Sequence, residues 1–413
     1  MKILFVHDRF GALAGAEANL YLTATELKKR GHTVAILHGP ATGKCEGDWK
    51  QTFDIAYPLA AGPTKQTVED ALAHYDPDIV YVHKTANIEL LALLVESGLP
   101  LVRMVHDHDI YCMRSYRYNV VTREICTKPA GLHCIVPCGA VIARNPGGML
   151  PIKFQSYFEK RREIDLNKQF HRMVVVTRFM RDELLLNGFN PSKIEIHAPV
   201  PRMGDASLRS NFSERNLIVY AGQIIRGKGV DILLKALSRI KTKFECVILG
   251  DGSHRKYCEK LSTRLGLDGR VRFVGFVPQD ELKQYYRECT VVAVPSVWPE
   301  PFATIGVEVL RYGIPVVAFD VGGLRDWLHD GVNGYLVPWM NDSVFAQRLE
   351  ELLINKTRAK AMGERGLLLA DQQFSFPQYI SNLECMFQRV TEELNSRSCS
   401  SQGVSASSHA FSR

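Results

Sequence analysis

Short apolar segments alternate with helical segments along most of this chain, and this alternation constrains its fold more than any other feature. Continuous apolar runs occur at 3–6, 34–37, 79–82, 101–105 and 173–176, and a second series follows at 217–220, 246–249, 271–274, 291–294 and 315–318. Such runs are typical of strands covered on both faces, and strands that alternate with helices form parallel sheets. The sequence therefore predicts an α/β chain with two Rossmann-like, doubly wound parallel-sheet domains.

The two series are expected to divide near residue 200. The segment 198–204 contains proline and glycine and separates the series. We predict a first domain at 1–199, with an insert at 106–150, and a second domain at 200–374. Apolar residues at helical spacing predict a final helix at 375–395, and the Ser-rich segment 396–413 is expected to be disordered.

The composition excludes several classes of protein. The chain has 413 residues, of which 46% are hydrophobic and 23% charged, as in globular rather than disordered or fibrous proteins. No apolar stretch approaches the roughly 18–20 residues of a membrane-spanning helix, and the first apolar run is too short for a signal peptide. We therefore expect a cytoplasmic protein whose ten cysteines are reduced, buried or bound to metal.

The densest group of candidate site residues follows the predicted strand 291–294. The segment 295–313 reads PSVWPEPFATIGVEVLRYG, with Glu300 before a predicted helix and Glu308 two turns into it. Ligands of open parallel sheets bind beyond the carboxyl ends of the strands, so both carboxylates can face one ligand in a cleft between the domains. An unpaired buried carboxylate is costly, and Glu308 is therefore expected to have a polar partner.

This segment resembles the donor domain of family 4 glycosyltransferases (glycosyl transferases group 1), which have the GT-B fold. The resemblance rests on the two glutamates eight residues apart, and further matching segments lie at 14–17, 31–34, 250–252, 275–278, 313–316, 321–323 and 330–334. It covers most of residues 1–390. It implies two domains that face a cleft, a last helix that crosses back to the first domain, and sugar transfer from a nucleotide sugar with retention of configuration and no cofactor required for catalysis.

The resemblance also implies roles for individual residues. Glu300 would bind donor-sugar hydroxyls, Glu308 the nucleotide ribose, and His106, after the strand 101–105, would lie beside the reacting sugar. The candidate catalytic residues are His106, Glu300 and Lys228, and the other donor-binding candidates are Gly15, Arg226, Gly250, Phe276, Val277, Ala303, Thr304 and Glu308. Ala303 stands where the family usually has glycine, and its added methyl group could narrow the choice of donor.

The turn GQIIRGKG at 222–229 is the expected clamp for the donor diphosphate. Small residues let the backbone approach a phosphate, the N-terminus of the next helix adds partial positive charge, and Lys228 adds a full charge. The family usually has arginine after the first glycine, where this chain has Gln223, and Arg226 could supply the missing charge. The alternative is that Arg226 and Lys228 only cap a surface turn.

Four of the ten cysteines, Cys112, Cys126, Cys134 and Cys138, fall within 27 positions of the insert. Four thiolates in a short, loop-rich segment can form a tetrahedral structural zinc site. An iron–sulfur cluster is a less favoured metal alternative. Packing thiols, or two disulfides in an oxidising compartment, would need no metal.

Positive charge concentrates in the same part of the chain. Residues 103–181 have a net charge of +8, whereas the whole chain has +7. Aromatic and basic side chains interleave at 153–162, which is typical of an interfacial helix and also of a solvated helix that packs its aromatic rings inward. The first alternative predicts contact with an anionic membrane, on the inner face of the cytoplasmic membrane. No nucleic-acid-binding motif accompanies the basic residues, so no nucleic-acid partner is expected.

The predicted function is a hexosyl transfer from a UDP- or GDP-sugar to a glycan or lipid-linked acceptor, in cell-surface polysaccharide or lipopolysaccharide synthesis. No residue is assigned as a general base, because the acceptor proton can pass to the departing phosphate oxygen. Two alternatives are a nucleotide-sugar epimerase of the same fold and a non-catalytic module that binds a glycan or nucleotide. Only Gln223 and Ala303 favour the non-catalytic module.

Overall fold

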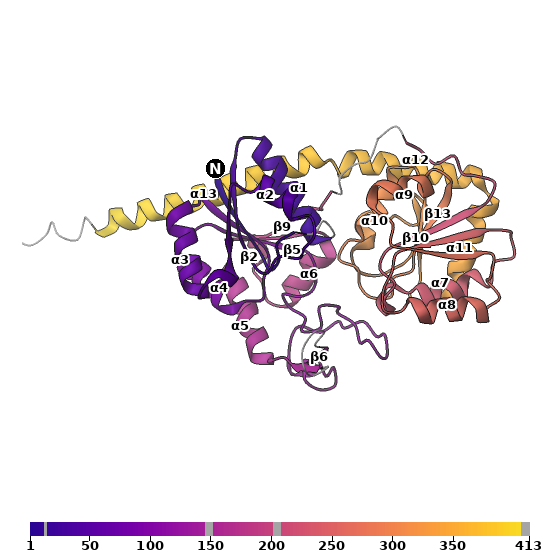
Figure 1. Cartoon of the computed structure of the whole chain (residues 1–413), viewed down its shortest axis with the longest axis horizontal. Helices are drawn as coiled ribbons and strands as arrows, with labels where there is room; N and C mark the ends of the chain where they lie inside the picture. The colour runs from indigo at the N-terminus through magenta and orange to yellow at the C-terminus, as the bar shows by residue number, and fades with distance from the viewer. Residues whose placement is uncertain (12–14, 145–151, 201–207, 406–413) are drawn as a thin grey trace, which may run out of the picture.

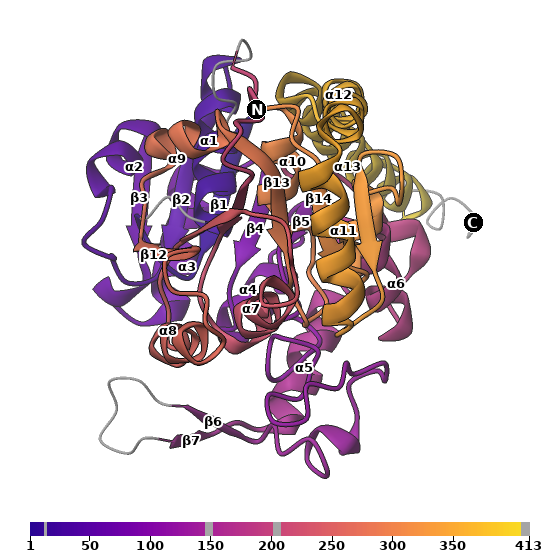
Figure 2. The ribbon, with the colours of Figure 1, turned by 90° about the vertical axis from the view of Figure 1, so that its right-hand side faces the viewer.

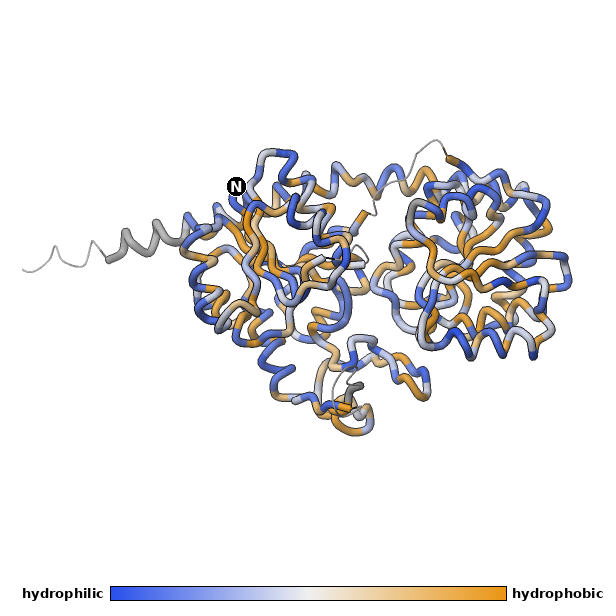
Figure 3. The backbone as a smooth tube through the Cα atoms, viewed as in Figure 1, coloured by the Kyte–Doolittle hydropathy of each residue, from blue (hydrophilic) through white to orange (hydrophobic). Residues whose placement is uncertain are grey.

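The computed structural model describes residues 1–11, 15–144, 152–200 and 208–405. Two α/β units stand side by side, each built from a sheet layered with helices (Figure 1). Apolar residues concentrate in the strands of both units, as the hydropathy colouring shows (Figure 3). The predicted architecture of two parallel-sheet domains is confirmed. Residues 201–204 of the expected linker lie outside the described residues.

The first sheet has seven parallel strands in the order β3-β2-β1-β4-β5-β8-β9. They are β1 (Lys2–His7), β2 (Thr33–His38), β3 (Ile55–Pro58), β4 (Ile79–Lys84), β5 (Leu101–Val105), β8 (Arg172–Val175) and β9 (Ile194–Ile196). Leu4 of β1 pairs with Val80 of β4, and both side chains are fully buried because helices cover both faces. The strand order reverses between β1 and β4, and ligands of such sheets bind at this switch point.

Six helices belong to the first domain: α1 (Ala16–Lys29), α2 (Glu46–Thr52), α3 (Thr64–Tyr75), α4 (Ile88–Glu96), α5 (Tyr157–Asn167) and α6 (Arg178–Leu186). Short 3-10 turns lie at η1 (Leu59–Ala61) and η3 (Pro191–Lys193). Side chains of Asn87, Ser156 and Thr177 cap α4, α5 and α6 by accepting hydrogen bonds from backbone N–H groups of the first turn. These capping residues fix where each helix begins after its strand or loop.

The second sheet has six parallel strands in the order β12-β11-β10-β13-β14-β15. They are β10 (Leu217–Ala221), β11 (Glu245–Leu249), β12 (Val271–Gly275), β13 (Cys289–Val294), β14 (Val316–Phe319) and β15 (Gly334–Val337). The helices are α7 (Val230–Leu237), α8 (Arg255–Arg264), α9 (Gln279–Tyr286), α10 (Thr304–Leu310), α11 (Asp342–Ile354) and α12 (Lys356–Gln373), with 3-10 turns η4 (Arg226–Lys228) and η5 (Gly322–Asp326). The five predicted strands are all present, and β15 is an additional edge strand.

The last helix, α13 (Phe376–Ser405), leaves the second domain and runs along the first (Figure 1). The amide of Asn19 in α1 donates a buried hydrogen bond to the hydroxyl of Tyr379, at 3.3 Å. The ring of Phe387 packs edge-on against Tyr81 of β4, with centroids 5.1 Å apart. The predicted return of the last helix to the first domain is therefore confirmed. Among the described residues, no helix combines the length and the apolar character needed to cross a bilayer.

In the structure α13 extends to Ser405, beyond the predicted end of this helix at residue 395. Each residue added to an existing helix gains a hydrogen bond at little cost, so the helix can continue through 396–405. Disorder of the Ser-rich segment stays a prediction. Residues 406–413 of the expected disordered tail lie outside the described residues.

The cysteine-rich insert leaves the first domain after β5 and forms a separate small layer. It contains the 3-10 turn η2 (Leu132–Cys134) and the strand β6 (Ile142–Arg144), and it extends past its predicted end at residue 150 because β6 pairs antiparallel with β7 (Ile152–Phe154). Met113, Cys134 and Ala140 form a second, small hydrophobic cluster, with Tyr157 packed against it. Figure 2 shows β6 and β7 projecting away from both sheets.

Candidate active site

The loop that carries Glu300 lies between the two domains. Nε2 of His108, in the first domain, is 2.8 Å from the carbonyl oxygen of Pro299, and the hydroxyl of Thr177 donates to the carbonyl of Pro301 at 2.9 Å. Because a carbonyl only accepts hydrogen bonds, Nε2 of His108 must carry the proton. The loop after β13 is thus held by the carboxyl ends of strands in both sheets, where the sequence predicts the site.

The carboxylate of Glu300 is the centre of this loop, and the residue is only 3% exposed. Its Oε1 atom accepts hydrogen bonds from Nζ of Lys228 at 2.6 Å, from Nε1 of Trp298 at 2.7 Å, and from the hydroxyl of Ser296. Burial alone would raise the pKa of Glu300, but Lys228 and these hydrogen bonds outweigh it and lower the pKa. Glu300 is therefore an ionised acceptor in a fixed orientation.

Glycines let the strand ends approach closely around Lys228. A Cβ atom at Gly229 would lie 1.9 Å from the carbonyl oxygen of Pro295, and one at Gly250 would lie 1.9 Å from that of Gly222. Gly229 and Gly250 also have positive φ angles of 67° and 132°. Only glycine tolerates both a positive φ angle and a carbonyl oxygen at the place of a Cβ atom. The backbone around the turn 222–229 is therefore closely packed.

Arg226 is engaged with the first domain in this structure. Its Nη2 atom donates to the carbonyl of Val121, in the insert, at 3.2 Å. Nearby, Arg123 of the insert forms an ion pair of 2.8 Å with Asp231 of α7, and both side chains are buried. The insert thus reaches the turn that follows β10. The family usually has an arginine at the position of Gln223. The idea that Arg226 supplies the missing positive charge to a donor diphosphate stays a prediction.

The remaining candidates of the 295–313 segment lie at and within α10. Ala303 precedes the helix with φ 58°, a left-handed conformation that favours the glycine usual at this position. Thr304, its first residue, is exposed, and Glu308 is half-buried. Burial chiefly, with a contribution from the negative charge of Glu308, raises the pKa of Tyr286 well above its usual value, so Glu308 lies near that phenol.

Gly15, Phe276 and Val277 follow the carboxyl ends of other strands. Gly15 begins α1 with φ 61° in the first domain. Phe276 follows β12 and is 81% exposed, while Val277 is half-buried. Each candidate thus lies at the strand end expected from the sequence, and the ring of Phe276 is accessible to a planar ligand.

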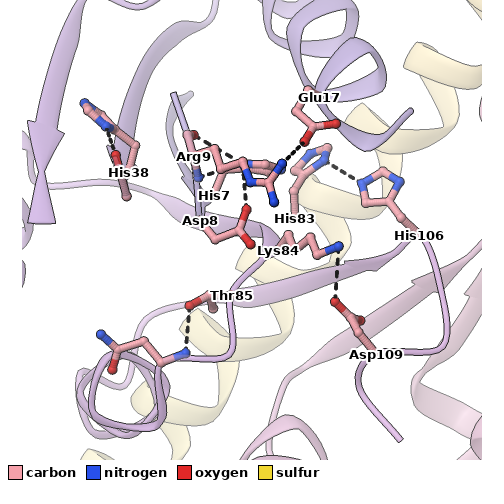
Figure 4. A network of polar contacts seen from close by, with 12 residues as sticks. His7, Asp8, Arg9, Glu17, His38, His83, Lys84, Thr85, His106 and Asp109 are labelled. Carbon is pink, nitrogen blue, oxygen red and sulfur yellow. Dashed lines mark hydrogen bonds and ion pairs between the residues drawn. The ribbon is translucent and has the colours of Figure 1, made fainter. Parts of the chain in front are cut away.

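A network of polar residues occupies the ends of β1, β4 and β5 in the first domain (Figure 4). Nδ1 of His83 lies 2.9 Å from Nε2 of His106. Nζ of Lys84 lies 3.1 Å from Asp107 and 3.6 Å from Asp109, so one ammonium bridges two carboxylates. His106 is therefore not a lone histidine but one member of a cluster.

Burial sets the charge of this cluster. It lowers the pKa of His106 to about 3, with the nearby His7 adding to the effect, and it lowers the pKa of His83 well below the usual value. Burial alone would also lower the pKa of Lys84, but the charges of Asp107 and Asp109 outweigh it and raise the pKa. The arrangement presents neutral imidazoles beside a charged lysine, which suits hydrogen bonding to uncharged hydroxyls.

Several residues of the site were not predicted from the sequence. Lys84 is the last residue of β4, and Asp107 and Asp109 lie two and four positions after the end of β5; this placement is a signal that the sequence offers. Ser296 and Trp298 share the loop of Glu300, but no local pattern indicates that they donate to one oxygen atom. Their role follows from the tertiary structure alone.

The four clustered cysteines line one cavity of about 220 Å³, together with His133. Nε2 of His133 lies 3.7 Å from Sγ of Cys134 and 3.9 Å from Sγ of Cys126. In the described part of the chain, no three histidine, cysteine or acidic side chains converge as ligands of one ion. The structure therefore does not present a preformed zinc site, and zinc binding here stays a prediction for elemental analysis to decide.

Two family models match the chain, one for each domain. The model described as Glycosyltransferase Family 4 matches residues 13–199, and the model described as Glycosyl transferases group 1 matches residues 208–368.

Several curated proteins that are similar to this chain are named as glycosyltransferases. An uncharacterized glycosyltransferase of Methanocaldococcus jannaschii is 27% identical over 268 residues, which cover 62% of this chain and 67% of that protein. A D-inositol 3-phosphate glycosyltransferase of Xylanimonas cellulosilytica is 32% identical over 210 residues, which cover 48% of this chain and 49% of that protein. The chain thus spans about half to two thirds of the length of these relatives.

Solved structures of glycosyltransferases share the fold over nearly the whole chain. Anabaena HepE in complex with UDP and glucose has a TM-score of 0.70 at 19% identity, with 94% of this chain and 99% of that chain covered. Sucrose-phosphate synthase of Thermosynechococcus elongatus has a TM-score of 0.68 at 15% identity, with 95% and 100% covered. With both family models matched in order and the two-domain architecture in place, the chain belongs to the family 4 glycosyltransferases and has the GT-B fold.

Proposed function

We propose that the chain transfers a hexose from a UDP- or GDP-sugar to a glycan or lipid-linked acceptor, with retention of anomeric configuration. The observation that carries this proposal is the pair Lys228–Glu300. It brings a cation suited to a diphosphate within 2.6 Å of a carboxylate suited to sugar hydroxyls, in a loop held between two domains. The structures of HepE with UDP and with UDP-glucose support a donor of this kind.

In this proposal the donor diphosphate binds at the turn 222–229. The glycine-rich backbone lets the phosphates approach, and the N-terminus of α7 contributes partial positive charge. Nζ of Lys228, on a side chain 23% exposed, turns from Glu300 toward the phosphate. The carboxylate of Glu300 then exchanges that ammonium for donor-sugar hydroxyls, while Trp298 and Ser296 keep it in place.

The chemical step follows from this arrangement. The bond between the anomeric carbon and the β-phosphate oxygen breaks, and the acceptor hydroxyl attacks the same face of the sugar. The acceptor proton passes to the departing phosphate oxygen, so no separate general base is required. Lys228 and backbone N–H groups stabilise the charge that develops on the leaving diphosphate, and preorganised donors of this kind are commonly the largest catalytic contribution.

His106 would act as a neutral hydrogen-bonding group beside the sugar. Because its pKa is about 3, its imidazole is uncharged at neutral pH and offers one N–H donor and one acceptor nitrogen. Its partner His83 takes one of these positions, which leaves the other for a sugar hydroxyl. The glycan or lipid-linked acceptors named above occur in cell-surface polysaccharide or lipopolysaccharide synthesis, and this is the cellular role that we propose.

The test is a donor screen followed by transfer assays. Thermal shift with UDP-, GDP- and ADP-sugars identifies the donor base, and release of the nucleoside diphosphate with and without glycan acceptors measures the reaction. We expect Lys228→Gln and Glu300→Gln to lower kcat by roughly a hundredfold or more. The matched controls are Lys235→Gln on the exposed side of α7 and Glu281→Gln on α9, both expected to be silent.

The outcomes separate the proposed activity from its alternatives. Unchanged transfer by the Glu300 variant overturns the assignment of the site. Conversion of the nucleotide sugar to its epimer, without release of a nucleoside diphosphate, identifies an epimerase. Donor binding without turnover on any acceptor identifies a non-catalytic binding module.

A further inference from the structure

The cysteine-rich insert exposes an unusual group of large apolar side chains. On its paired strands, Ile142 is directly opposite Phe154, and Ile152 lies two residues before Phe154 on the same face. Their exposed fractions are 45% for Ile142, 44% for Ile152 and 80% for Phe154. Phe158, at the start of α5, is 78% exposed. Contiguous apolar exposure of this kind marks a surface that a partner covers.

The loop around η2, in the same insert, also exposes large apolar side chains. Leu132 is 71% exposed and Val136 is 76% exposed, on the same insert. Elsewhere in the insert Met113 and Cys134 are buried, and Tyr157 packs partly against them. The insert therefore combines a small buried cluster with a set of exposed large apolar side chains, here called its outer face.

Basic residues flank the exposed aromatic rings. On α5, Arg161 and Arg162 lie three and four residues after Phe158 and thus share its face of the helix, and both are exposed. Lys153 is exposed next to Phe154. Within the described residues, no ion pair is found for Lys153, Arg161 or Arg162, unlike Lys160, which pairs with Glu163 at 2.5 Å. These three charges are available to an anionic partner.

We infer that the outer face of the insert docks on an anionic lipid bilayer. Aromatic and aliphatic side chains enter the boundary between headgroups and acyl chains, while adjacent arginines and lysine contact lipid phosphates. Charge complementarity selects this partner, because a second copy of the chain would bring the same unpaired cations against each other. The net charge of +8 over residues 103–181 adds long-range attraction to the surface.

The insert that carries this face also contacts the candidate active site. The insert begins directly after His106, and the ring of Tyr116 in the insert packs on Trp298, with centroids 5.2 Å apart. Trp298 donates to the carboxylate of Glu300. A bilayer bound to the outer face would thus be joined through one continuous segment to the site. This inference goes beyond the proposed function, since it holds for any acceptor presented at a membrane surface.

Vesicle flotation with the full chain tests the inference. Vesicles of phosphatidylcholine alone are compared with vesicles that also contain phosphatidylglycerol, at low and high NaCl. We expect binding only to the anionic vesicles, with a partition coefficient that falls as salt rises. Phe154→Glu/Phe158→Glu and Arg161→Gln/Arg162→Gln should each lower that coefficient on the order of tenfold or more. The control Ile354→Glu alters a side chain that is 68% exposed at the end of α11, and it should bind as the wild type does.

Two further measurements keep the result interpretable. Circular dichroism and nucleotide-induced thermal shift should be unchanged in both double variants, because neither touches the donor site. Failure of the wild type to bind anionic vesicles, or equal binding by wild type and the Phe154→Glu/Phe158→Glu variant, overturns the inference. Concentration-dependent dimers that the same variant abolishes, without any vesicle binding, would assign the face to a second copy of the chain.

Discussion

Nδ1 of His83 lies 2.9 Å from Nε2 of His106, so these two imidazoles share one hydrogen bond. Burial lowers the pKa of both residues, and two neutral rings can share a proton only if one donates and the other accepts. The tautomer of His106, and hence the nitrogen that it offers to a ligand, therefore depends on His83. This is a positioning role that a lone histidine at a strand end would lack.

We expect His83→Phe to lower kcat for sugar transfer on the order of ten- to hundredfold, because misorientation of a group at the reacting centre is costly. Phenylalanine keeps the packing against Phe5 and Tyr81 but removes the hydrogen bond. Steady-state kinetics with the identified donor measures the effect. His38→Phe is the control, since that buried histidine bonds to the backbone carbonyl of Gly39 and not to His106. Equal losses in the two variants would contradict a specific role for His83.

The buried histidines predict a stability that falls in mild acid. Burial lowers the pKa of His108 to about 4 and that of His106 to about 3, whereas an unfolded histidine titrates near 6.5. Below pH 6.5 the unfolded chain therefore binds more protons than the folded chain, and the free energy of unfolding decreases as pH falls. Each such histidine contributes a slope of about 1.4 kcal/mol per pH unit until its folded pKa is reached.

Urea unfolding between pH 5 and 7.5 measures this slope. His108→Gln should reduce it by about one proton, since glutamine does not titrate and can still donate to the carbonyl of Pro299. The matched control is His74→Gln, on the exposed side of α3. A slope for His108→Gln that equals the wild-type slope would show that the pKa of His108 is not lowered in the folded chain.

The buried ion pair between Arg123 and Asp231 is predicted to hold the insert against the second domain. Arg123→Met leaves the carboxylate of Asp231 buried without its 2.8 Å partner, and loss of one member of a buried pair typically costs about 3–5 kcal/mol. Arg123→Met/Asp231→Leu should recover most of this loss, because neither charge then remains. Urea unfolding measures both variants.

An exposed pair provides the control for that experiment. Arg215 contacts Glu245 and Glu288 at the surface, where ion pairs contribute about 0–1 kcal/mol. Arg215→Met should therefore change stability little. A double variant as unstable as Arg123→Met alone would indicate that packing, and not the unpaired charge, causes the loss.

Ala303→Gly is expected to stabilise the chain by up to about 1 kcal/mol. The left-handed conformation of Ala303, with φ 58°, costs about 1–2 kcal/mol for a residue with a Cβ atom, and the added freedom of an unfolded glycine cancels part of the gain. Thermal unfolding measures the change, and the same exchange at Ala359 within α12 should destabilise. A wider donor range in Ala303→Gly would show that the methyl group restricts the donor.

The cysteines of the insert are expected to be free of disulfides. The nine cysteines whose side chains the structure describes are unpaired, so thiol titration in denaturant should detect them without a reducing agent. Elemental analysis of the same sample measures zinc, and Cys126→Ser and Cys134→Ser should lose any zinc that Cys45→Ser retains. Missing thiols that appear only after reduction would indicate disulfides, while a full thiol count without zinc would leave packing cysteines.

The position of the candidate donor site in the fold could be predicted because its residues follow local rules. Lys228 lies in a glycine-rich turn and Glu300 in a loop after a buried strand, and parallel sheets place both at one edge. The hydrogen bonds that fix Glu300 could not be predicted. Lys228 is 72 positions away in sequence, and only the pairing of β10 with β13 brings the two loops together.

In the first domain, too, the positions of site residues could be predicted, but their contacts could not. His106 was predicted through a resemblance, but its contact with His83 depends on the register of β4 beside β5. The engagement of Arg226 with Val121 crosses a domain boundary, and no local pattern indicates it. The sequence left open whether the aromatic rings at 153–162 are exposed or pack inward, and only the packed structure shows that Phe154 and Phe158 are exposed while Tyr157 packs against the cluster around Met113.

The sequence by itself determined the alternation of strands and helices, the two parallel sheets, the presence of a last helix and the turns that carry the candidate site. These features depend on periodicity, capping and turn chemistry, which act over a few neighbouring residues. The tertiary structure alone decided which side chains meet, which are charged and which face of the insert is exposed. Those properties depend on burial and on contacts between residues far apart in the chain, which exist only once the sheets, the insert and α13 have packed together.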